Sequence, residues 1–520
     1  MRDRALLVTL AVALLALGAA ADEEFAPDVP AACAAVAPIP LVSPTVLGDG
    51  TPGSVTTAGI QAALNAGGQI RFDVGPGPVT IDVTSELTVS KAAVLDGGGN
   101  VTLSGRGLNR VLRVLNAVIA SQAYLFGLQN ITIANGATPG DSGAGMLAGR
   151  SGDWQAVDLR IVNVTFRNNV AIEIAQDDGG GAIYAVGARE LLIAGSVFEG
   201  NRGSNGGAVY SLGTKTVTLV GSRFSDNTAT GNSGNPGNGG NGGAIGVDGA
   251  QRTVTICGTR ILANHSTAYG TGFFSVGYDA LSPTTFYRTT FQGNVQTSST
   301  EFAAGAYVQG VPFTITESSF LQNQANGYSG LFLGPGATGT IENSTFYGNL
   351  AREGLGGAIA VNTTAPVTIV NSTIVGNQAS GVNAFGGGIQ VGATNALTLR
   401  NVVLAFNTGG NVWNPWNISR TVAGSHVIQY PQFRPSPSGQ AEPAAVATSQ
   451  IWADPLILTP AWNGGPTKTM ALTASSPARD AGTTTGAPSI DQRSVPRDGA
   501  PDVGAYELST DVIFADGFEP

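Results

Sequence analysis

Residues 180–201 read GGAIYAVGARELLIAGSVFEGN, and this stretch contains two short motifs that recur along the chain. The first is Gly-Gly-Ala-Ile or a close variant, which begins at Gly180, Gly206, Gly242, Gly356 and Gly386. The second is an apolar residue followed three places later by asparagine, as in Phe198 and Asn201. It recurs from Phe166 to Asn407 with an average spacing of about 30 residues, which is typical of a solenoid.

Within each repeat, apolar and polar residues alternate, as in Val217-Thr218-Leu219 and Val367-Thr368-Ile369. A period of two predicts short β-strands. Because glycine and asparagine separate these strands and no helical pattern lies between them, we predict an all-β fold in which each repeat is one coil of a parallel β-helix. The inward Val, Ile, Leu and Phe side chains would then stack into apolar columns, and the doubled glycines would form tight turns.

The recurring asparagines are predicted to form a structural column, in which each stacked amide pairs with the coils above and below it. The alternative is a row of asparagines that contacts a ligand. The column consists of Asn169, Asn201, Asn227, Asn264, Asn294, Asn323, Asn349, Asn377 and Asn407.

Both ends of a β-helix need caps, because open ends expose unpaired strands and the core. At the N-terminal end, Thr57, Ile60, Ala63 and Leu64 share one face of a predicted helix. At the C-terminal end, Trp413 and Trp416 are predicted to plug an irregular cap. The predicted segments are a signal peptide at 1–21, an N-terminal segment and cap at 22–68, the β-helix at 69–410, a C-terminal region at 411–510 and a tail at 511–520.

The N-terminus has the pattern of a secretory signal. Arg2 and Arg4 precede an apolar run at 5–17, and small residues at 19–21 predict cleavage after Ala21. No later stretch is long and apolar enough to cross a bilayer, so the mature chain is expected to have no transmembrane segment. Export permits a disulfide between Cys33 and Cys257, and the sequence leaves open whether they pair.

Composition restricts the function classes. Glycine occupies 74 of 520 positions without the period of collagen, and an apolar content of 42% is too high for a disordered spacer. Charged residues make up 12% of the chain and the net charge is -10, which argues against nucleic acid as a partner.

The paired motifs resemble the repeat of polymorphic outer-membrane proteins, which are surface adhesins with a right-handed, pectin-lyase-like β-helix. The resemblance implies a secreted or cell-surface protein of a Gram-negative bacterium. The chain departs from those proteins after Asn407, where its roughly 110 residues lack the regular ten-residue alternation of a membrane β-barrel.

The C-terminal region instead resembles a choice-of-anchor Q domain. The resemblance is carried by residues 463–467, 471–482, 491–493 and 502–507. Met470 stands where that family is expected to have histidine, so no role of that histidine carries over. At the N-terminal end, relatives often have a cysteine pair where this chain has Val55 and Val74. The final residues, DVIFADGFEP at 511–520, resemble a short ending of exported proteins and are either a sorting tag or a frayed terminus.

Enzymes with β-helix folds include polysaccharide lyases and glycosidases, which need carboxylates held together on one face. Asp177 and Asp178, near Glu173, are the candidate group, and we interpret them as a solvated loop. The two histidines, His265 and His426, have no metal-ligand spacing, so we predict no catalytic residue, no cofactor and no metal site. The alternative is a calcium site at which scattered aspartates of successive coils converge, namely Asp141, Asp153, Asp158, Asp177 and Asp178.

Binding has more support from the sequence. The position after the Gly-Gly-Ala-Ile motif varies along the repeats, as Tyr184, Tyr210, Gly246, Phe274, Val308, Leu333, Ala360 and Gln390, and is therefore expected to point outward. Tyr184, Tyr210 and Phe274 could share one face and stack against sugar rings, or they could pack under a side loop. We therefore predict a monomeric, adhesin-like protein that binds polysaccharide or cell-surface glycans. The alternatives are a lyase or glycosidase acting on acidic polysaccharide, and a structural spacer.

Overall fold

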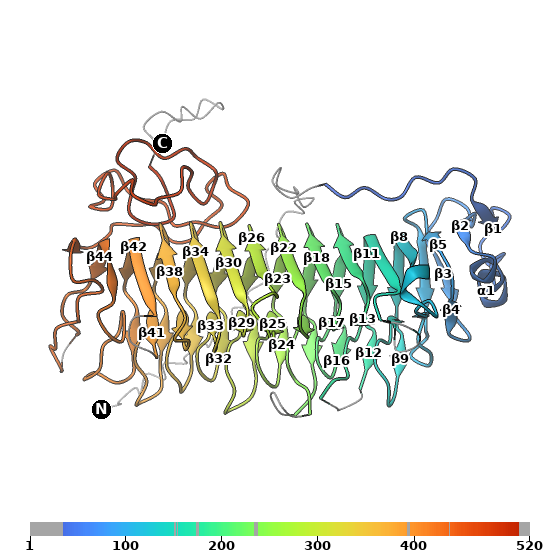
Figure 1. Cartoon of the computed structure of the whole chain (residues 1–520), viewed down its shortest axis with the longest axis horizontal. Coiled ribbons are helices and arrows are strands. Elements are labelled where there is room, and N and C mark those ends of the chain that lie inside the picture. The colour runs from blue at the N-terminus through green and yellow to red at the C-terminus, as the bar shows by residue number, and fades with distance from the viewer. Residues whose placement is uncertain are drawn as a thin grey trace, which may run out of the picture.

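The computed structural model describes residues 35–149, 152, 154–172, 176–232, 238–392, 396–435 and 437–508. The chain forms a right-handed parallel β-helix of about 13 turns, as the repeats predict (Figure 1). The predicted signal peptide at 1–21 and the tail at 511–520 lie outside the described residues.

Each coil contributes strands to three parallel sheets. In one coil, β13 (Ile183–Val186) belongs to sheet B, β14 (Glu190–Ala194) and β15 (Val197–Glu199) belong to sheet A, and β16 (Arg202–Gly203) belongs to sheet C. Each of these strands pairs in parallel with the corresponding strand of the next coil. In the described part of the chain, sheets A, B and C have 24, 11 and 10 strands.

Sheet B consists of β4 (Leu87–Val89), β7 (Leu112–Val114), β10 (Met146–Ala148), β13, β17 (Val209–Leu212), β21 (Ile245–Asp248), β25 (Phe273–Val276), β29 (Ala306–Gln309), β33 (Leu331–Leu333), β37 (Ile359–Val361) and β41 (Ile389–Val391). Sheet C consists of β9 (Ala137–Thr138), β12 (Val170–Ala171), β16, β20 (Thr228–Ala229), β24 (His265–Ser266), β28 (Val295–Gln296), β32 (Gln324–Ala325), β36 (Leu350–Ala351), β40 (Gln378–Ala379) and β43 (Thr408–Gly409).

Sheet A consists of β1 (Thr45–Leu47), β2 (Gly68–Phe72), β3 (Val79–Asp82), β5 (Ala93–Asp96), β6 (Val101–Ser104), β8 (Tyr124–Ala134), β11 (Val157–Arg167), β14, β15, β18 (Thr216–Val220), β19 (Arg223–Ser225), β22 (Thr253–Cys257), β23 (Arg260–Leu262), β26 (Thr284–Tyr287), β27 (Thr290–Gln292), β30 (Pro312–Thr316), β31 (Ser319–Leu321), β34 (Thr338–Glu342), β35 (Thr345–Tyr347), β38 (Val367–Val370), β39 (Thr373–Val375), β42 (Leu397–Ala405), β44 (Ala423–Tyr430) and β45 (Gln450–Trp452).

The phenylalanines of the second motif form a column inside the helix. The rings of Phe166 and Phe198 are stacked with centroids 5.1 Å apart, and those of Phe198 and Phe224 are 4.5 Å apart. After Ile261 the column continues through Phe291, Phe320 and Phe346, and none of these side chains is exposed. Full burial of one such ring stabilises the fold by roughly 2 to 3 kcal/mol, and the column joins each coil to the next.

The asparagines form a second column in the turn between sheets A and C. The Nδ2 of Asn169 donates to the Oδ1 of Asn201 at 2.9 Å, and the same bond recurs from coil to coil as far as Asn407. Asn417 accepts the last of these bonds and extends the column by one residue beyond the nine in the sequence pattern. Each Nδ2 also donates to a backbone carbonyl, as from Asn201 to Phe166, so these buried amides are saturated.

A column of serine and threonine hydroxyls, which the repeat motifs do not predict, runs through the bend of sheet A. The hydroxyl of Ser222 accepts the backbone N–H of Ser196 at 3.1 Å, and Thr259, Ser318, Ser344 and Ser372 play the same part in other coils. These hydroxyls satisfy backbone groups at a bend where the strand ladder is interrupted.

The N-terminal end is capped by α1 (Thr57–Ala66), and the four residues predicted to share its inner face, Thr57, Ile60, Ala63 and Leu64, are its buried residues. The hydroxyl of Thr56 caps the helix by accepting the N–H of Gly59. The short helix η1 (Ala120–Gln122) lies in the loop from sheet B to sheet A. Among the described residues, no helix is long and apolar enough to cross a membrane.

Residues 35–44 form what we call the strap, which runs lengthwise over the outer face of sheet A (Figure 1). Gln129 accepts the N–H of Ile39 at 2.7 Å and donates to its carbonyl at 2.9 Å. Further along, Arg160 donates to the carbonyl of Ala37, and Val36 packs near Cys257. Cys257 is disulfide-bonded, and Cys33, the only other cysteine of the sequence, lies outside the described residues.

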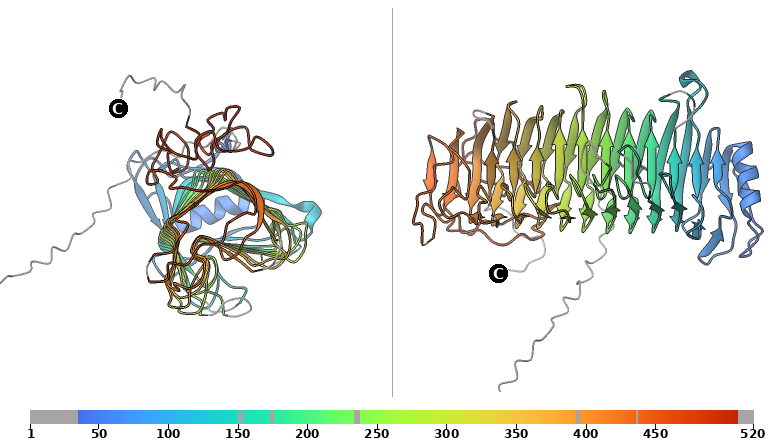
Figure 2. Two further views of the ribbon diagram at one scale, coloured as in Figure 1. Left: turned by 90° about the vertical axis from the view of Figure 1, so that its left-hand side faces the viewer. Right: turned by 90° about the horizontal axis from the view of Figure 1, so that it is seen from below.

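Residues 453–508 form what we call the C-terminal lobe, which covers the other half of the same face (Figures 1 and 2). Met470, Leu472 and Val503 make an apolar cluster with Val403 of β42 and Ile428 of β44. The lobe therefore packs along the side of the β-helix. The expectation that both tryptophans plug the end is wrong for Trp413, which is 66% exposed, whereas Trp416 packs on Gly409 of the last coil.

Candidate functional site

Tyr184, Tyr210 and Phe274 lie on the outer face of sheet B, outside the main core. Tyr184 and Tyr210 are paired in register, and their rings are stacked with centroids 5.6 Å apart. Tyr210 also covers Gly246, because a Cβ on that glycine would lie 2.8 Å from the tyrosine ring. The three side chains are only 2%, 2% and 1% exposed. They do not form an open stacking face in this structure, and sugar binding at these rings stays a prediction.

The same column contains two further rings. Phe274 pairs in register with Tyr307, and Tyr307 pairs with Phe332. The sequence pattern predicts Val308 and Leu333 in this column, and this prediction is wrong by one residue. The Gly-Gly-Ala-Ile motif is degraded in these two coils, to Ala304-Gly305-Ala306 and Gly330-Leu331, so it could not fix the register.

Loops between sheets C and B cover these rings. Tyr269 stacks on Tyr307 with centroids 5.2 Å apart, and Phe302 lies 4.7 Å from Phe332. Burial raises the pKa of Tyr307 to about 12, and burial also raises the pKa of Tyr210 well above its usual value. These phenols are therefore neutral at physiological pH, and the cluster behaves as a satellite core beneath the loops.

Those carboxylates singled out in the sequence that the structure describes do not gather into one centre. Asp178 accepts a hydrogen bond from the Ser142 hydroxyl at 2.9 Å, whereas Asp177 is exposed and its backbone carbonyl accepts from Tyr184. Glu173, the third member of that group, and Asp153, one of the scattered aspartates, lie outside the described residues. Asp158 lies on sheet A, where it accepts a bond of 2.7 Å from Arg189.

Another acidic pair brackets a buried arginine. The guanidinium of Arg110 is paired with Glu86 on one side and Asp141 on the other. This pairing joins successive coils at the loop side of sheet B. Within the described residues, no group of three or more His, Cys, Asp or Glu side chains could hold a metal ion. His265 lies in sheet C and His426 in sheet A, so they do not share a site.

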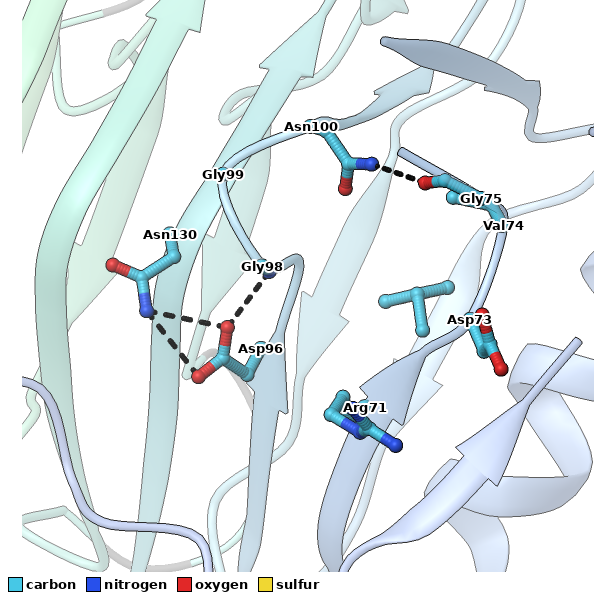
Figure 3. Close-up of a pocket in the computed structure, with 10 residues that line it drawn as sticks. Arg71, Asp73, Val74, Gly75, Asp96, Gly98, Gly99, Asn100 and Asn130 are labelled. Carbon is cyan, nitrogen blue, oxygen red and sulfur yellow. Dashed lines mark hydrogen bonds between the residues drawn. The ribbon is translucent and has the colours of Figure 1, made fainter. Parts of the chain in front are cut away.

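One polar pocket in the described part of the chain lies near the N-terminal cap and has a volume of about 410 Å³ (Figure 3). The Asp96 carboxylate accepts hydrogen bonds from the Gly98 N–H at 2.8 Å and from the Asn130 amide at 3.2 Å. Gln129, which holds the strap, donates to the same carboxylate at 2.7 Å. These bonds make Asp96 an organiser of the turn that the sequence motif Asp96-Gly97-Gly98-Gly99 encodes.

Another pocket in the described part of the chain has a volume of about 490 Å³ and opens beside sheet C. It is lined by Arg106, Asn135 and Asn168, which all have positive φ, together with Val170 and small residues. Arg106 also lies 3.6 Å from the Asp82 carboxylate, with both side chains about half exposed. This open pocket presents to solvent the amides of Asn135 and Asn168 and the guanidinium of Arg106, which is shared with Asp82.

Among the residues that carry the choice-of-anchor Q resemblance, Asp491, Gln492 and Glu507 are buried in contacts of the C-terminal lobe. Asp491 accepts hydrogen bonds from the N–H of Arg493 and of Glu507, and Arg497 pairs with Glu507 at 2.7 Å. Gln492 reaches out of the lobe and bonds to sheet A. In this structure these residues position the lobe on the β-helix.

The most exposed aromatic residues near sheet B were not singled out in the sequence. Trp154 is 58% exposed and Tyr278 is 66% exposed, and both lie in loops that lead from sheet B to sheet A. The contact of Trp154 with glycine backbone could not be predicted, because Trp154 belongs to no repeated motif of the sequence. The glycines beneath it, Gly187 and Gly213, were visible only as turn residues.

Comparison with known proteins finds the same repeat. Residues 163–186, which span one phenylalanine–asparagine motif and one Gly-Gly-Ala-Ile motif, match the Chlamydia polymorphic membrane protein repeat. This chain is therefore a parallel β-helix protein with repeats similar to those of polymorphic membrane proteins. No curated protein matches the chain.

Proposed function

We propose that this chain is an exported, surface-exposed β-helix protein of a Gram-negative bacterium that binds glycans or surfaces as an adhesin does. The observation that carries the proposal is the polymorphic membrane protein repeat at residues 163–186, set in a long β-helix of in-register coils. Coils of this kind supply a rigid scaffold, on which exposed loops can present binding groups. The signal peptide at 1–21 and the choice-of-anchor Q-like C-terminal region belong to the same proposal.

Surface exposure is tested in cells that produce the full chain. We expect protease added outside intact cells, or antibody against the loops of sheet B, to reach the protein. Fractionation should place it in the outer membrane or the medium. Recovery only in the cytoplasm of intact cells would contradict the proposal, and a periplasmic marker and a cytoplasmic marker control for lysis.

Glycan binding is tested with the purified mature chain on a panel of neutral and acidic oligosaccharides. We expect saturable binding to at least one class without release of products. Release of reducing or unsaturated sugars that is lost in Asp177→Ala would instead support the lyase or glycosidase alternative. If the chain binds no member of the panel and no cell surface, the remaining alternative is that it acts as a structural spacer.

A further inference from the structure

The corner between sheets B and A contains a strip of glycine backbone, which we call the glycine corner. It consists of Gly187, Gly213 and Gly249, which directly follow β13, β17 and β21 in successive coils. The N–H of Gly187 donates to the carbonyl of Leu212, and the N–H of Gly213 donates to the carbonyl of Asp248, both at 2.8 Å. Adjacent coils therefore hold the strip in register, about 4.8 Å apart.

The indole of Trp154 lies over this strip. A Cβ on Gly187 would lie 2.8 Å from the indole Cδ2 of Trp154, and a Cβ on Gly213 would lie 2.8 Å from Cζ3. Only glycine at both positions leaves room for the ring across two coils. Because the side chain is 58% exposed while one face rests on backbone, its other face is open to solvent.

Tyr278 stands at the other end of the strip, where it follows Gly277 and β25. Val276, two residues before Tyr278, pairs in register with Asp248, the residue that precedes Gly249. Asp248 is 8% exposed, and this register places Tyr278 in the coil next to Gly249, with its phenol near the Asp248 carboxylate. The two exposed rings thus flank Gly249, which packs against Gly213.

The charges around the corner are acidic on the outside. Asp177 and Asp248 both act on Tyr278, and the carboxylate of Asp177 has no hydrogen-bond partner among the described residues. Of the cations beside the strip, Arg189 is paired with Asp158, Lys215 follows Gly213 by two residues, and Arg252 is 1% exposed and donates inward to Ser275 and to the carbonyl of Val276. Glu190 and Asp279 lie in or beside the same loops, so the described carboxylates outnumber the cations there. Such a surface repels uronates, sulfates and phosphates, whereas exposed carboxylates can accept hydrogen bonds from sugar hydroxyls.

We propose that Trp154 and Tyr278 form a stacking site for a neutral glycan across the glycine corner, with Asp177 accepting hydrogen bonds from the sugar hydroxyls. The C–H faces of uncharged hexoses or N-acetylhexosamines match the open indole and phenol faces. This inference rests on the proposed function and assigns the contact to exposed rings instead of the buried Tyr184, Tyr210 and Phe274. The buried rings then act as the packed support of the sheet on which the corner is built.

The test measures binding of cellohexaose, chitohexaose, mannohexaose and hexagalacturonate to the purified mature chain by calorimetry and tryptophan fluorescence. We expect at least one neutral hexasaccharide to bind, and Trp154→Ala and Tyr278→Ala each to raise its Kd about tenfold. Trp413→Ala is the matched control, because Trp413 is similarly exposed at the far end of the β-helix. Thermal melts verify that each variant is folded, and Trp154→Phe should recover part of the affinity.

The outcomes separate the inference from the proposed function. A neutral glycan that binds the Trp154→Ala/Tyr278→Ala double variant as well as the parent chain overturns this site and leaves the proposed function standing. Preferential binding of hexagalacturonate at low ionic strength also overturns it, because the acidic corner predicts the reverse. No binding of any of the four hexasaccharides by the parent chain overturns this site, and the proposed function is overturned with it only if the chain also binds no cell surface.

Discussion

The hydroxyl of Thr345 donates a hydrogen bond of 2.7 Å to the side-chain carbonyl of Gln492, and both residues are fully buried. The Gln492 amide then donates to Ser319 Oγ and Thr467 Oγ1, each at 2.9 Å. One glutamine therefore joins two neighbouring coils of sheet A to the C-terminal lobe. Because the residues it joins are up to 173 positions apart in sequence, this contact defines where the lobe docks.

Replacing Gln492 with alanine should loosen the lobe without unfolding the β-helix. The Thr345 hydroxyl would lose its partner, at a cost of about 1 to 3 kcal/mol, whereas Ser319 and Thr467 keep their bonds to the carbonyls of Lys468 and Glu317. Limited proteolysis should then cut within 453–508 faster than in the parent chain, while the far-ultraviolet spectrum is unchanged. Gln61→Ala is a control glutamine in the same chain, because Gln61 bonds to Thr88 at the N-terminal cap, away from the lobe. Equal cleavage of the lobe in both variants would contradict the role of Gln492.

Interrupting the asparagine column should destabilise the β-helix. In Asn294→Ala, Asn264 loses the acceptor of both its side-chain and its backbone bond, and the carbonyl of Ile261 loses a donor. We expect a loss of several kcal/mol in the free energy of unfolding, at about 1 to 3 kcal/mol for each buried group. Denaturant melts measure it, with Asn168→Gly at an exposed, positive-φ turn as the control. Equal melts would show that the buried column is dispensable.

Close contact between coils explains the glycine of the Gly-Gly-Ala-Ile motif at Gly207. A Cβ there would overlap the carbonyl oxygen of Gly243 and lie 2.5 Å from the carbonyl carbon of Thr228. Gly207→Ala should therefore fold poorly or melt at a markedly lower temperature. Gly77→Ala, where a Cβ would meet nothing within 4 Å, should melt like the parent chain.

The disulfide at Cys257 should hold the strap onto sheet A. Peptide mapping without reductant is expected to recover the Cys257 peptide linked to the peptide of Cys33, the only other cysteine. Reduction, or Cys257→Ser, should lower stability by up to about 5 kcal/mol in the chain-entropy account and expose residues 35–44 to protease. Unlinked peptides from the exported protein would contradict this pairing.

Docking of the lobe should weaken as the pH rises from about 4 to about 6. Burial raises the pKa of Asp502 from 3.8 to about 6, so the folded lobe binds this proton more tightly than the unfolded chain does. The stabilisation is therefore present at low pH and is lost as Asp502 ionises. Burial raises the pKa of Glu317 as well, beneath the same lobe.

Hydrogen exchange in 453–508 at pH 4.5 and 7, corrected for the intrinsic rate, measures this dependence. Asp502→Asn should flatten it, because the amide has no proton to lose in this range. A lobe that opens less readily at pH 7 than at pH 4.5 would contradict the assignment.

The sequence predicted the coils well because each coil repeats a local pattern. The buried phenylalanines and asparagines recur three places apart, and that spacing survives in every coil from Phe166 to Asn407. The hydroxyl column that contains Ser222 was not predicted, because serine and threonine also occur on the polar side of strands. The register slip at Tyr307 and Phe332 arose where the glycine motif itself is degraded.

Contacts between distant segments could not be read from the repeats. The bond between Ile39 and Gln129 spans 90 residues, and that between Arg288 and Ser494 spans 206. The seat of Trp154 on Gly187 likewise depends on two loops from different coils. The spacing of residues within a repeat does not predict contacts between distant segments. The positions of the strap, the C-terminal lobe and the glycine corner therefore had to come from the structure.

The strap and the C-terminal lobe both lie on sheet A: Val36 of the strap packs near Cys257, and the ring of Trp462 in the lobe lies 4.9 Å from the guanidinium of Arg260, three residues after Cys257. Both described ends of the polypeptide thus leave from the broad flank formed by sheet A (Figure 1). A tether attached at either end would turn sheet A towards its support, with the long axis of the β-helix parallel to that surface. The loop-bearing flank of the β-helix would then face the surroundings along its whole length.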